Sequence, residues 1–170
     1  MTNTRFSTTV HVLVELAKNP KEQLSSSQLA ANLGTHPVVV RRLVALLKQA
    51  ELVTSTKGAK GGVRLAIKAD EIPLSQVAEL TDENLGFETH NVLSELAVSN
   101  PFTDAVLTVI EAERRKVHLA AISYLDGISI KNVLETSVLR CELTDLVARG
   151  MTDEQIRMQY HIEDGHLVKK

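Results

Sequence analysis

The sequence contains no tryptophan, and aromatic residues make up only 3% of its 170 positions. A protein that stacks the bases of single-stranded nucleic acid needs aromatic rings, so this function class is disfavoured. Hydrophobic residues nonetheless amount to 44%, which is enough for a buried core. Leu, Val, Ile and Ala must fill that core, and this composition suits helices better than a β-sandwich.

Cysteine is almost missing as well, because Cys141 is the only one. An internal disulfide framework and a zinc site built on cysteines are therefore excluded. No apolar run approaches the roughly 20 residues that a membrane-spanning helix requires. Residues 1–6 also lack the hydrophobic region of a secretory signal, so we expect a cytoplasmic protein.

The familiar motifs of enzymes do not occur in the chain. It has no G-x-S-x-G, no H-E-x-x-H, no P-loop and no Rossmann fingerprint. His90, His118, His161 and His166 are scattered, without the i, i+4 spacing of a metal-binding pair on a helix. We therefore predict no enzymatic activity, no metal site and no cofactor, while an unidentified small-molecule effector remains open.

Charge is distributed unevenly along the chain, although the formal net charge is only −2. Residues 1–70 carry ten Lys or Arg and four acidic side chains, whereas residues 71–170 carry nine basic and seventeen acidic ones. Such an asymmetry is typical of proteins that bind nucleic acid, although solvated surface charges can also divide in this way by chance.

The first 49 residues have the pattern of three helices. Apolar residues recur at helical spacing over residues 4–18, and a short helix is expected through residues 28–33 with N-caps available in the preceding serines. Gly34 suits the end of that helix, and Thr35 is the expected cap of a third helix that runs to about Gln49. A short helix, a tight turn and a longer helix form the helix-turn-helix pattern.

A glycine-rich hairpin is predicted directly after the third helix. Residues 52–55 and 63–67 have the pattern of strands, and residues 56–62 form a basic tip between them. A hairpin in this position is a wing, whose glycines let the backbone approach a phosphate or a groove closely. An ordinary hairpin with no such role is the alternative.

The second half of the chain is predicted to be helical. A short helix over residues 73–80 closes the first domain, residues 88–98 form a further helical stretch, and a long amphipathic helix spans about 102–125. The apolar stripe of this long helix needs a partner, for which a second copy of the chain is the economical choice and its own domain the alternative.

After the break at Asp126-Gly127, residues 128–135 are expected to form a short strand or turn that leads into a helix. Residues 138–148 form another amphipathic helix, and a last helix begins with Thr152 as its cap and Gln155 as the partner in a capping box. Residues 161–170 are polar and are expected to fray.

The predicted fold class is mainly α. It consists of a winged helix-turn-helix domain with a two-stranded β wing over residues 1–82, a linker and dimerisation helix over 83–137, and a C-terminal helical extension over 138–170.

Several segments in this order resemble a known family. They are Arg5-Phe6-Ser7, Ser27-Gln28-Leu29-Ala30, the run from Leu43 to Val53, Ile72-Pro73-Leu74 and the wing, whose glycines follow the pattern G-x-K-G-G-x-x-L. Over about residues 4–82 the chain resembles the BadM/IscR/NsrR/CymR-type winged-helix transcriptional regulators of bacteria. The region from about residue 138 onward resembles nothing in that family.

The resemblance implies a homodimer that reads an imperfect palindrome in double-stranded DNA and usually represses transcription. Part of the family holds an iron–sulfur cluster on three cysteines that follow the winged domain. This chain has no cysteine between residues 81 and 140, so a cysteine-ligated cluster is not expected.

The third helix is expected to lie in the major groove with its N-terminal part facing the bases. Either Arg41 or Arg42 can bind a guanine, and Val38 or Val39 can contact a thymine methyl group. The start of the preceding helix suits a phosphate, and the wing supplies basic residues. The full set of predicted DNA-binding residues is Arg5, Ser25, Ser26, Ser27, Gln28, Thr35, His36, Val38, Val39, Arg41, Arg42, Lys57, Lys60, Gly61, Gly62 and Arg64.

Cys141 is the only redox-capable thiol. Its position in an amphipathic helix favours burial, which would make it inert. A redox sensor would instead require an exposed thiol with a lowered pKa. A winged helix used only for protein contacts, without DNA binding, is the alternative to the DNA-binding function.

Overall fold

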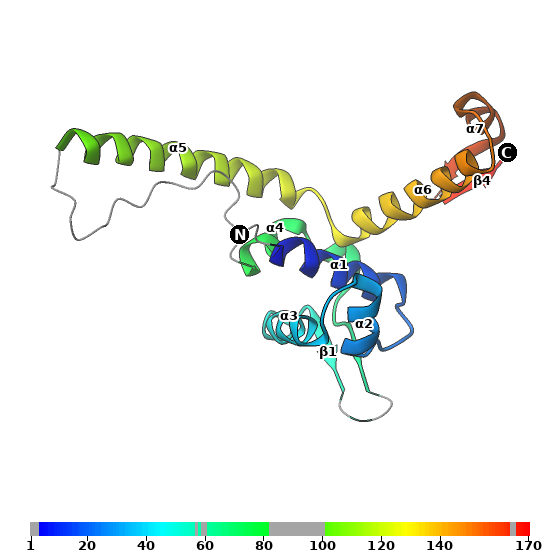
Figure 1. The fold of residues 1–170 in the computed structure, drawn as a ribbon, viewed down its shortest axis with the longest axis horizontal. Helices are drawn as coiled ribbons and strands as arrows, with labels where there is room; N and C mark the ends of the chain where they lie inside the picture. Colours follow the sequence, from blue (N-terminus) through cyan, green and yellow to red (C-terminus); the bar gives the residue numbers. More distant parts are fainter. Residues whose placement is uncertain (1–3, 57, 59–60, 82–100, 164–165) are drawn as a thin grey trace.

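The structure, a computed structural model, describes residues 4–56, 58, 61–81, 101–163 and 166–170. A compact N-terminal unit carries two helices, α5 and α6, that project from it as arms in different directions (Figure 1). The wing extends from the opposite side of the unit (Figure 1). The element order agrees with the predicted mainly α class.

The three N-terminal helices are α1 (Arg5–Lys18), α2 (Ser26–Leu33) and α3 (Pro37–Gln49). A capping box joins Ser25 and Gln28 at the start of α2, and Gly34 ends this helix in the left-handed conformation with a φ of 64°. His36, rather than the expected Thr35, caps α3, because its Nδ1 accepts the N–H of Val38 at 3.2 Å.

The wing consists of β1 (Val53–Ser55) and β2 (Val63–Leu65), which pair in an antiparallel arrangement. Two backbone hydrogen bonds between Leu24 and Val63, of 3.0 and 2.9 Å, attach the chain before α2 to the second strand. The wing is therefore fixed at its base to the segment between α1 and α2.

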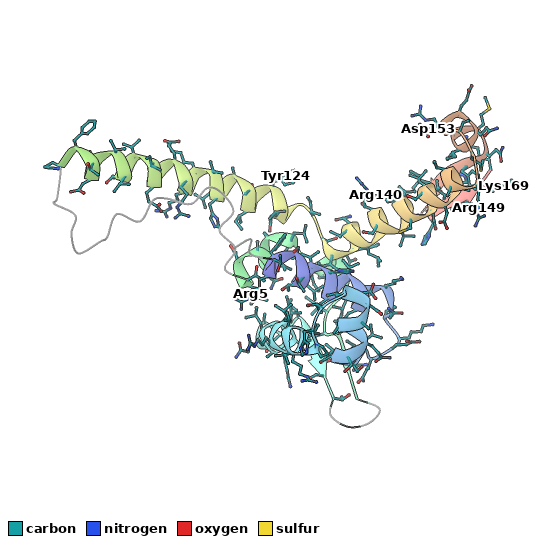
Figure 2. All side chains as sticks on the ribbon, viewed as in Figure 1. Arg5, Tyr124, Arg140, Arg149, Asp153 and Lys169 are labelled. Atoms are coloured by element: carbon teal, nitrogen blue, oxygen red, sulfur yellow. The ribbon has the colours of Figure 1, made fainter. Side chains whose placement is uncertain are left out.

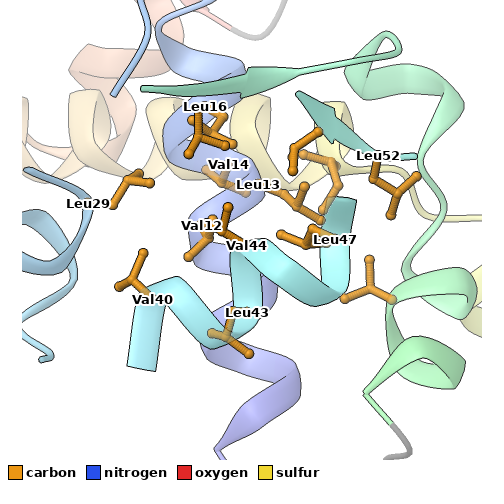
Figure 3. Packing of buried hydrophobic residues seen from close by; sticks show 14 of the residues in the cluster. Val12, Leu13, Val14, Leu16, Leu29, Val40, Leu43, Val44, Leu47 and Leu52 are labelled. Carbon is orange, nitrogen blue, oxygen red and sulfur yellow. The ribbon is translucent and has the colours of Figure 1, made fainter. Parts of the chain in front are cut away.

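One apolar core unites these elements (Figure 3). Helix α3 buries one stripe against α1, and α2 and the start of the wing close the sides of the core. The predicted core positions of α3 are all buried, namely Val40, Leu43, Val44 and Leu47. Because the buried stripe recurs every three or four residues, the opposite face of α3 is left to solvent.

A short 3₁₀ turn, η1 (Ala69–Glu71), and helix α4 (Leu74–Leu80) follow the wing, and α4 packs against α5 (Pro101–Asp126). The turn after α5 is held to the start of α4 by backbone hydrogen bonds from Leu74 to Ile128 (2.8 Å) and from Ile130 to Ile72 (2.9 Å). Ile130 is fully buried in the core of the N-terminal unit. The junction between the two arms is therefore part of that core.

The predicted break between residues 128–135 and the helix at 138–148 is wrong. Residues 130–148 form one continuous helix, α6 (Ile130–Ala148), where a strand or turn and a separate later helix were expected. A capping box between Ser129 and Asn132 starts this helix directly after the bridge to Pro73, so no break is needed near residue 137.

The end of the chain does not fray as expected. Helix α7 (Asp153–Gln159), with the predicted capping box, leads into a hairpin of β3 (Tyr160–Glu163) and β4 (His166–Lys169) that packs on α6. The Leu167 N–H donates to the Glu142 carboxylate at 2.7 Å, which attaches β4 to α6.

The predicted helical stretch at residues 88–98 lies outside the described residues. Within the described part of the chain, no helix combines the length and apolarity that crossing a bilayer requires.

Candidate nucleic-acid interface

The outward face of α3 is the centre of the candidate site. His36, Val38, Val39, Arg41 and Arg42 are all exposed at the N-terminal half of this helix. Val38 and Val39 are each 41% exposed, which is unusual for two adjacent valines beside a well-formed core. A thymine methyl group is one apolar partner that such side chains can meet in a major groove.

The charges around this helix have one sign. From residue 23 to residue 69 the chain has seven Lys or Arg side chains, and Glu51 is its only acid. Arg41 and Arg42 make no hydrogen bond or ion pair with the residues that the structure describes. Their guanidinium groups thus remain available for the bidentate contacts with guanine or phosphate that arginine makes best.

The start of α2 lies before this helix in the chain and contributes the predicted polar residues. Ser27 and Gln28 are exposed, whereas Ser25 and Ser26 are half-buried. The Ser25 hydroxyl accepts the Gln28 N–H at 3.2 Å, and the Gln28 Oε1 accepts the Ser25 N–H at 2.8 Å. The capping box therefore occupies these acceptors and leaves the Gln28 side-chain NH₂ group and the Ser27 hydroxyl for other partners.

The turn between the two helices is tight. The Thr35 N–H donates to the Ala30 carbonyl at 2.9 Å, and Thr35 is half-buried. The role of His36 as the cap of α3 was missed in the sequence. The signal that identifies it is Pro37, because proline favours the first helical position and the cap directly precedes it.

In the wing, Arg64 and the two predicted glycines have different surroundings. Arg64 is exposed, and its Nε lies 3.4 Å from the Thr54 hydroxyl on the facing strand. Gly61 is half-buried and Gly62 is buried. A Cβ at Gly62 would lie 2.9 Å from the backbone carbon of Gln23, so this glycine is required by packing inside the protein. Lys57 and Lys60 lie outside the described residues.

Arg5 is exposed at the first position of α1.

The wing lies on the side of the unit that faces away from α5 and α6 (Figure 1). A duplex bound along α3 and the wing would therefore not meet the two arms.

Helix α5 exposes the predicted apolar stripe. None of its described residues is buried, and Val109 and Tyr124 are 63% and 72% exposed. Tyr124 stands out from the helix near its C-terminal end (Figure 2). Other large apolar side chains on the same face are also exposed, namely Phe102, Val106, Ile110 and Val117. Such a continuous face is expected to be covered by another protein surface.

The prediction that Cys141 is buried is wrong, because this thiol is exposed on α6. The neighbouring Glu142 binds the C-terminal hairpin through His166 Nδ1 (2.8 Å) and the Leu167 N–H. These two hydrogen bonds, with His166 the larger cause, hold the pKa of Glu142 below its usual value. Exposure removes the argument that Cys141 is inert but does not by itself make it a sensor.

Comparison with known proteins matches most of the chain to one family. Residues 2–136 match the Rrf2 family, which is described as an iron-dependent transcriptional regulator. YwnA of Bacillus subtilis (strain 168) is 36% identical over 75 residues, which are 44% of this chain and 53% of YwnA. Protein rrf2 of Nitratidesulfovibrio vulgaris is 34% identical over 83 residues, 48% of this chain and 54% of that protein. The matched region thus spans about half the length of these curated relatives.

Among solved structures, CymR (YrzC), the global cysteine regulator of B. subtilis, has a similar fold. It superposes with a TM-score of 0.55 and 21% identity, over 79% of this chain and 95% of CymR. The predicted winged helix-turn-helix fold is thereby confirmed.

The family is described as iron-dependent, so its members can be asked for residues that would hold iron. Cys141 is the only cysteine of the chain, and it lies beyond the matched residues. Within the described ranges, no three His, Cys, Asp or Glu side chains come together as metal ligands. A cluster held by three cysteines therefore does not fit these residues.

Proposed function

Because the chain belongs to the Rrf2 family of transcriptional regulators, we propose that it binds double-stranded DNA in a sequence-specific manner, as a homodimer that represses transcription from an imperfect palindrome. The observation that carries this proposal is the exposed, acid-free face of α3 between the start of α2 and the wing. Such a regulator works in the cytoplasm, where bacterial DNA lies.

The proposed contacts divide into two kinds. Arg42 or Arg41 reads a base edge in the major groove, with Val38 and Val39 against thymine methyl groups. The polar start of α2, Arg5 and the basic residues of the wing bind phosphates and set the register. Gly61 and Gly62 serve this interface by fixing the direction of the wing.

The proposed dimer uses α5. Its 26 residues give a helix of about 39 Å, long enough for two antiparallel copies to cover each other's apolar stripe. Two copies joined in this way present two reading helices, and dimers of this kind recognise half-sites about one helical turn of DNA apart.

The test is fluorescence anisotropy with the promoter DNA of the protein's own gene and with random DNA, each at two salt concentrations. We expect tighter binding to the promoter and a strong loss of affinity at higher salt, because phosphate contacts release counterions. Equal affinity for both DNAs would contradict sequence-specific binding. Absence of binding at either salt concentration would favour a winged helix used only for protein contacts.

Two substitutions separate the proposed contacts. Arg42→Ala should weaken promoter binding by about 1–3 kcal/mol and relax the preference at one base pair. Lys60→Ala should lower the slope of the salt dependence by about one unit on any DNA. Arg140→Ala is the matched control, because Arg140 is an exposed arginine on the α6 arm (Figure 2). An equal effect of Arg42→Ala on promoter and random DNA would instead assign Arg42 to phosphate.

A further inference from the structure

A cavity of about 670 Å³ lies between α1 and α6, on the side of α1 that does not pack against α3. Each helix contributes a stripe of residues spaced three or four positions apart, so the two helices form opposite walls. The floor is aliphatic, with Val14 of α1 and Leu134 and Val138 of α6 among its residues. This volume is in the range of pockets that hold small organic molecules, about 300–1,000 Å³.

The walls of this cavity are acidic. Glu15 of α1 and Glu142 and Asp145 of α6 line it, against Lys18 and His11 of α1 as the basic side chains. Among the described residues, no ion pair joins Lys18 to any of these carboxylates. Glu142 is paired with His166, whereas Glu15 and Asp145 have no basic partner within the described part of the chain.

The three carboxylates differ in how they are already used. Both oxygens of Glu142 hold the C-terminal hairpin, through His166 and Leu167. Glu15 accepts a hydrogen bond from the Asn32 side-chain amide at 2.9 Å with Oε2, and its Oε1 has no such partner among the residues that the structure describes. The Asp145 side chain makes no hydrogen bond or ion pair with any described residue. Two facing helices thus offer free carboxylate oxygens above an aliphatic floor.

We propose that this cavity binds a small organic amine, with its ammonium group between Glu15 and Asp145 and its apolar body on the aliphatic floor. Among the described residues, no Phe, Tyr or Trp side chain lines the cavity, so it lacks the rings that best hold a quaternary ammonium through cation–π contacts. An ammonium with N–H donors suits it better, because such a group forms charge-assisted hydrogen bonds with carboxylates.

The site lies where a ligand can act on DNA binding. Helix α1 carries the cavity on one face and the core contacts of α3 on another, while α6 follows α5 after the turn at residues 127–129. An amine bound between α1 and α6 therefore acts on the helix against which the reading helix α3 packs. This consequence rests on the proposed DNA-binding dimer, whereas the binding site itself does not.

The binding test uses the full-length protein without DNA. Phenethylamine is the probe, and 2-phenylethanol is its uncharged counterpart of nearly the same shape. Titration calorimetry should show saturable binding of the amine and at least severalfold weaker binding of the alcohol. Cys141 lines the same cavity and is the only thiol, so its alkylation by iodoacetamide should slow as the amine binds.

Asp145→Asn keeps the shape of the side chain and removes its charge, and it should weaken amine binding roughly two- to fivefold, as expected for a partly solvated ion pair. Glu79→Gln on α4 is the matched control, because it removes one exposed charge outside the cavity and should change nothing. Equal binding of amine and alcohol, or an unchanged affinity in Asp145→Asn, would overturn the proposal.

A second variant, Ser137→Phe, places a ring into the cavity and should abolish amine binding while the protein stays folded. If the amine does not bind the wild-type protein and Ser137→Phe instead turns dimers into monomers in light scattering, a second copy of the chain occupies the cavity and the ligand proposal is wrong. All these measurements omit DNA, so their failure is distinct from a failure of the proposed regulatory function.

Discussion

Gly62 gives the sharpest test of how the wing is attached. A Cβ at this position would lie 2.9 Å from both the backbone carbon and the Cβ of Gln23, and 3.0 Å from its carbonyl oxygen. The Gln23 segment cannot retreat freely, because the two backbone hydrogen bonds between Leu24 and Val63 hold it against β2. Gly62→Ala must therefore either compress this contact or break a hydrogen bond.

The expected cost follows from these alternatives. Overpacking of a well-packed site costs about 1–3 kcal/mol. Loss of one backbone hydrogen bond costs about 1 kcal/mol. We therefore expect Gly62→Ala to lower the free energy of unfolding by about 1–3 kcal/mol, measured by urea denaturation with far-UV circular dichroism. Amide hydrogen exchange at Leu24 and Val63 should also become faster, because these groups form the bonds at risk.

Gly34 is the natural comparison, because its requirement for glycine has a different cause. It has a φ of 64°, and a Cβ there would meet no atom within 4 Å. Gly34→Ala should cost roughly 1–2 kcal/mol through the left-handed backbone alone. Asparagine tolerates that conformation, so Gly34→Asn should recover part of the loss, whereas Gly62→Asn should be no better than Gly62→Ala. A Gly62→Ala protein within about 0.5 kcal/mol of the wild type would refute the close approach to Gln23.

Three further changes test other parts of the molecule. Leu47→Ala removes a fully buried side chain of α3, so urea denaturation should show a loss of about 2–5 kcal/mol, and a loss below about 1 kcal/mol would contradict its place in the core. Val109→Glu places a charge on the exposed stripe of α5 and should convert the proposed dimer into monomers in light scattering, while an unchanged dimer would move the interface elsewhere. Glu142→Gln should speed exchange of the Leu167 amide, because an uncharged amide accepts a weaker hydrogen bond than a carboxylate. In the wild type, the lowered pKa of Glu142 means that the hairpin contact is complete above the ordinary glutamate pKa of 4.5 and is lost as pH falls through the lower folded value. A loss of Leu167 protection, relative to the intrinsic exchange rate, already near neutral pH would contradict this assignment.

The N-terminal unit was predictable because its signals are local. The three helices, the turn at Gly34 and the hairpin each follow from spacing, caps and glycines within a few residues. The exposed face of α3 follows equally well, because the positions left over from its buried stripe can be counted in the sequence. The candidate DNA contacts on that face therefore did not require the structure to be found.

The C-terminal part was harder to predict because its stability comes from distant partners. The hairpin of β3 and β4 is polar. Its second strand is held at His166 and Leu167 by the carboxylate of Glu142, which lies more than twenty residues earlier in the chain. Cys141 was expected to be buried because its helix has apolar positions, but it lies in the cavity between α1 and α6, where the thiol stays exposed. Local periodicity cannot report either fact.

By itself, the sequence determined the reading unit of this protein: a helix-turn-helix with a basic wing, a positive charge excess in the first 70 residues and too few cysteines for a cluster. The reason is that helix periodicity, capping and charge are properties of neighbouring residues. Only the tertiary structure decided that Gly62 serves the packing of the wing against Gln23, that Ile130 ties the junction of the two arms into the core, and that α1 and α6 enclose an acidic cavity. Each of these depends on segments far apart in the chain meeting at van der Waals or hydrogen-bond distance, which sequence spacing does not encode.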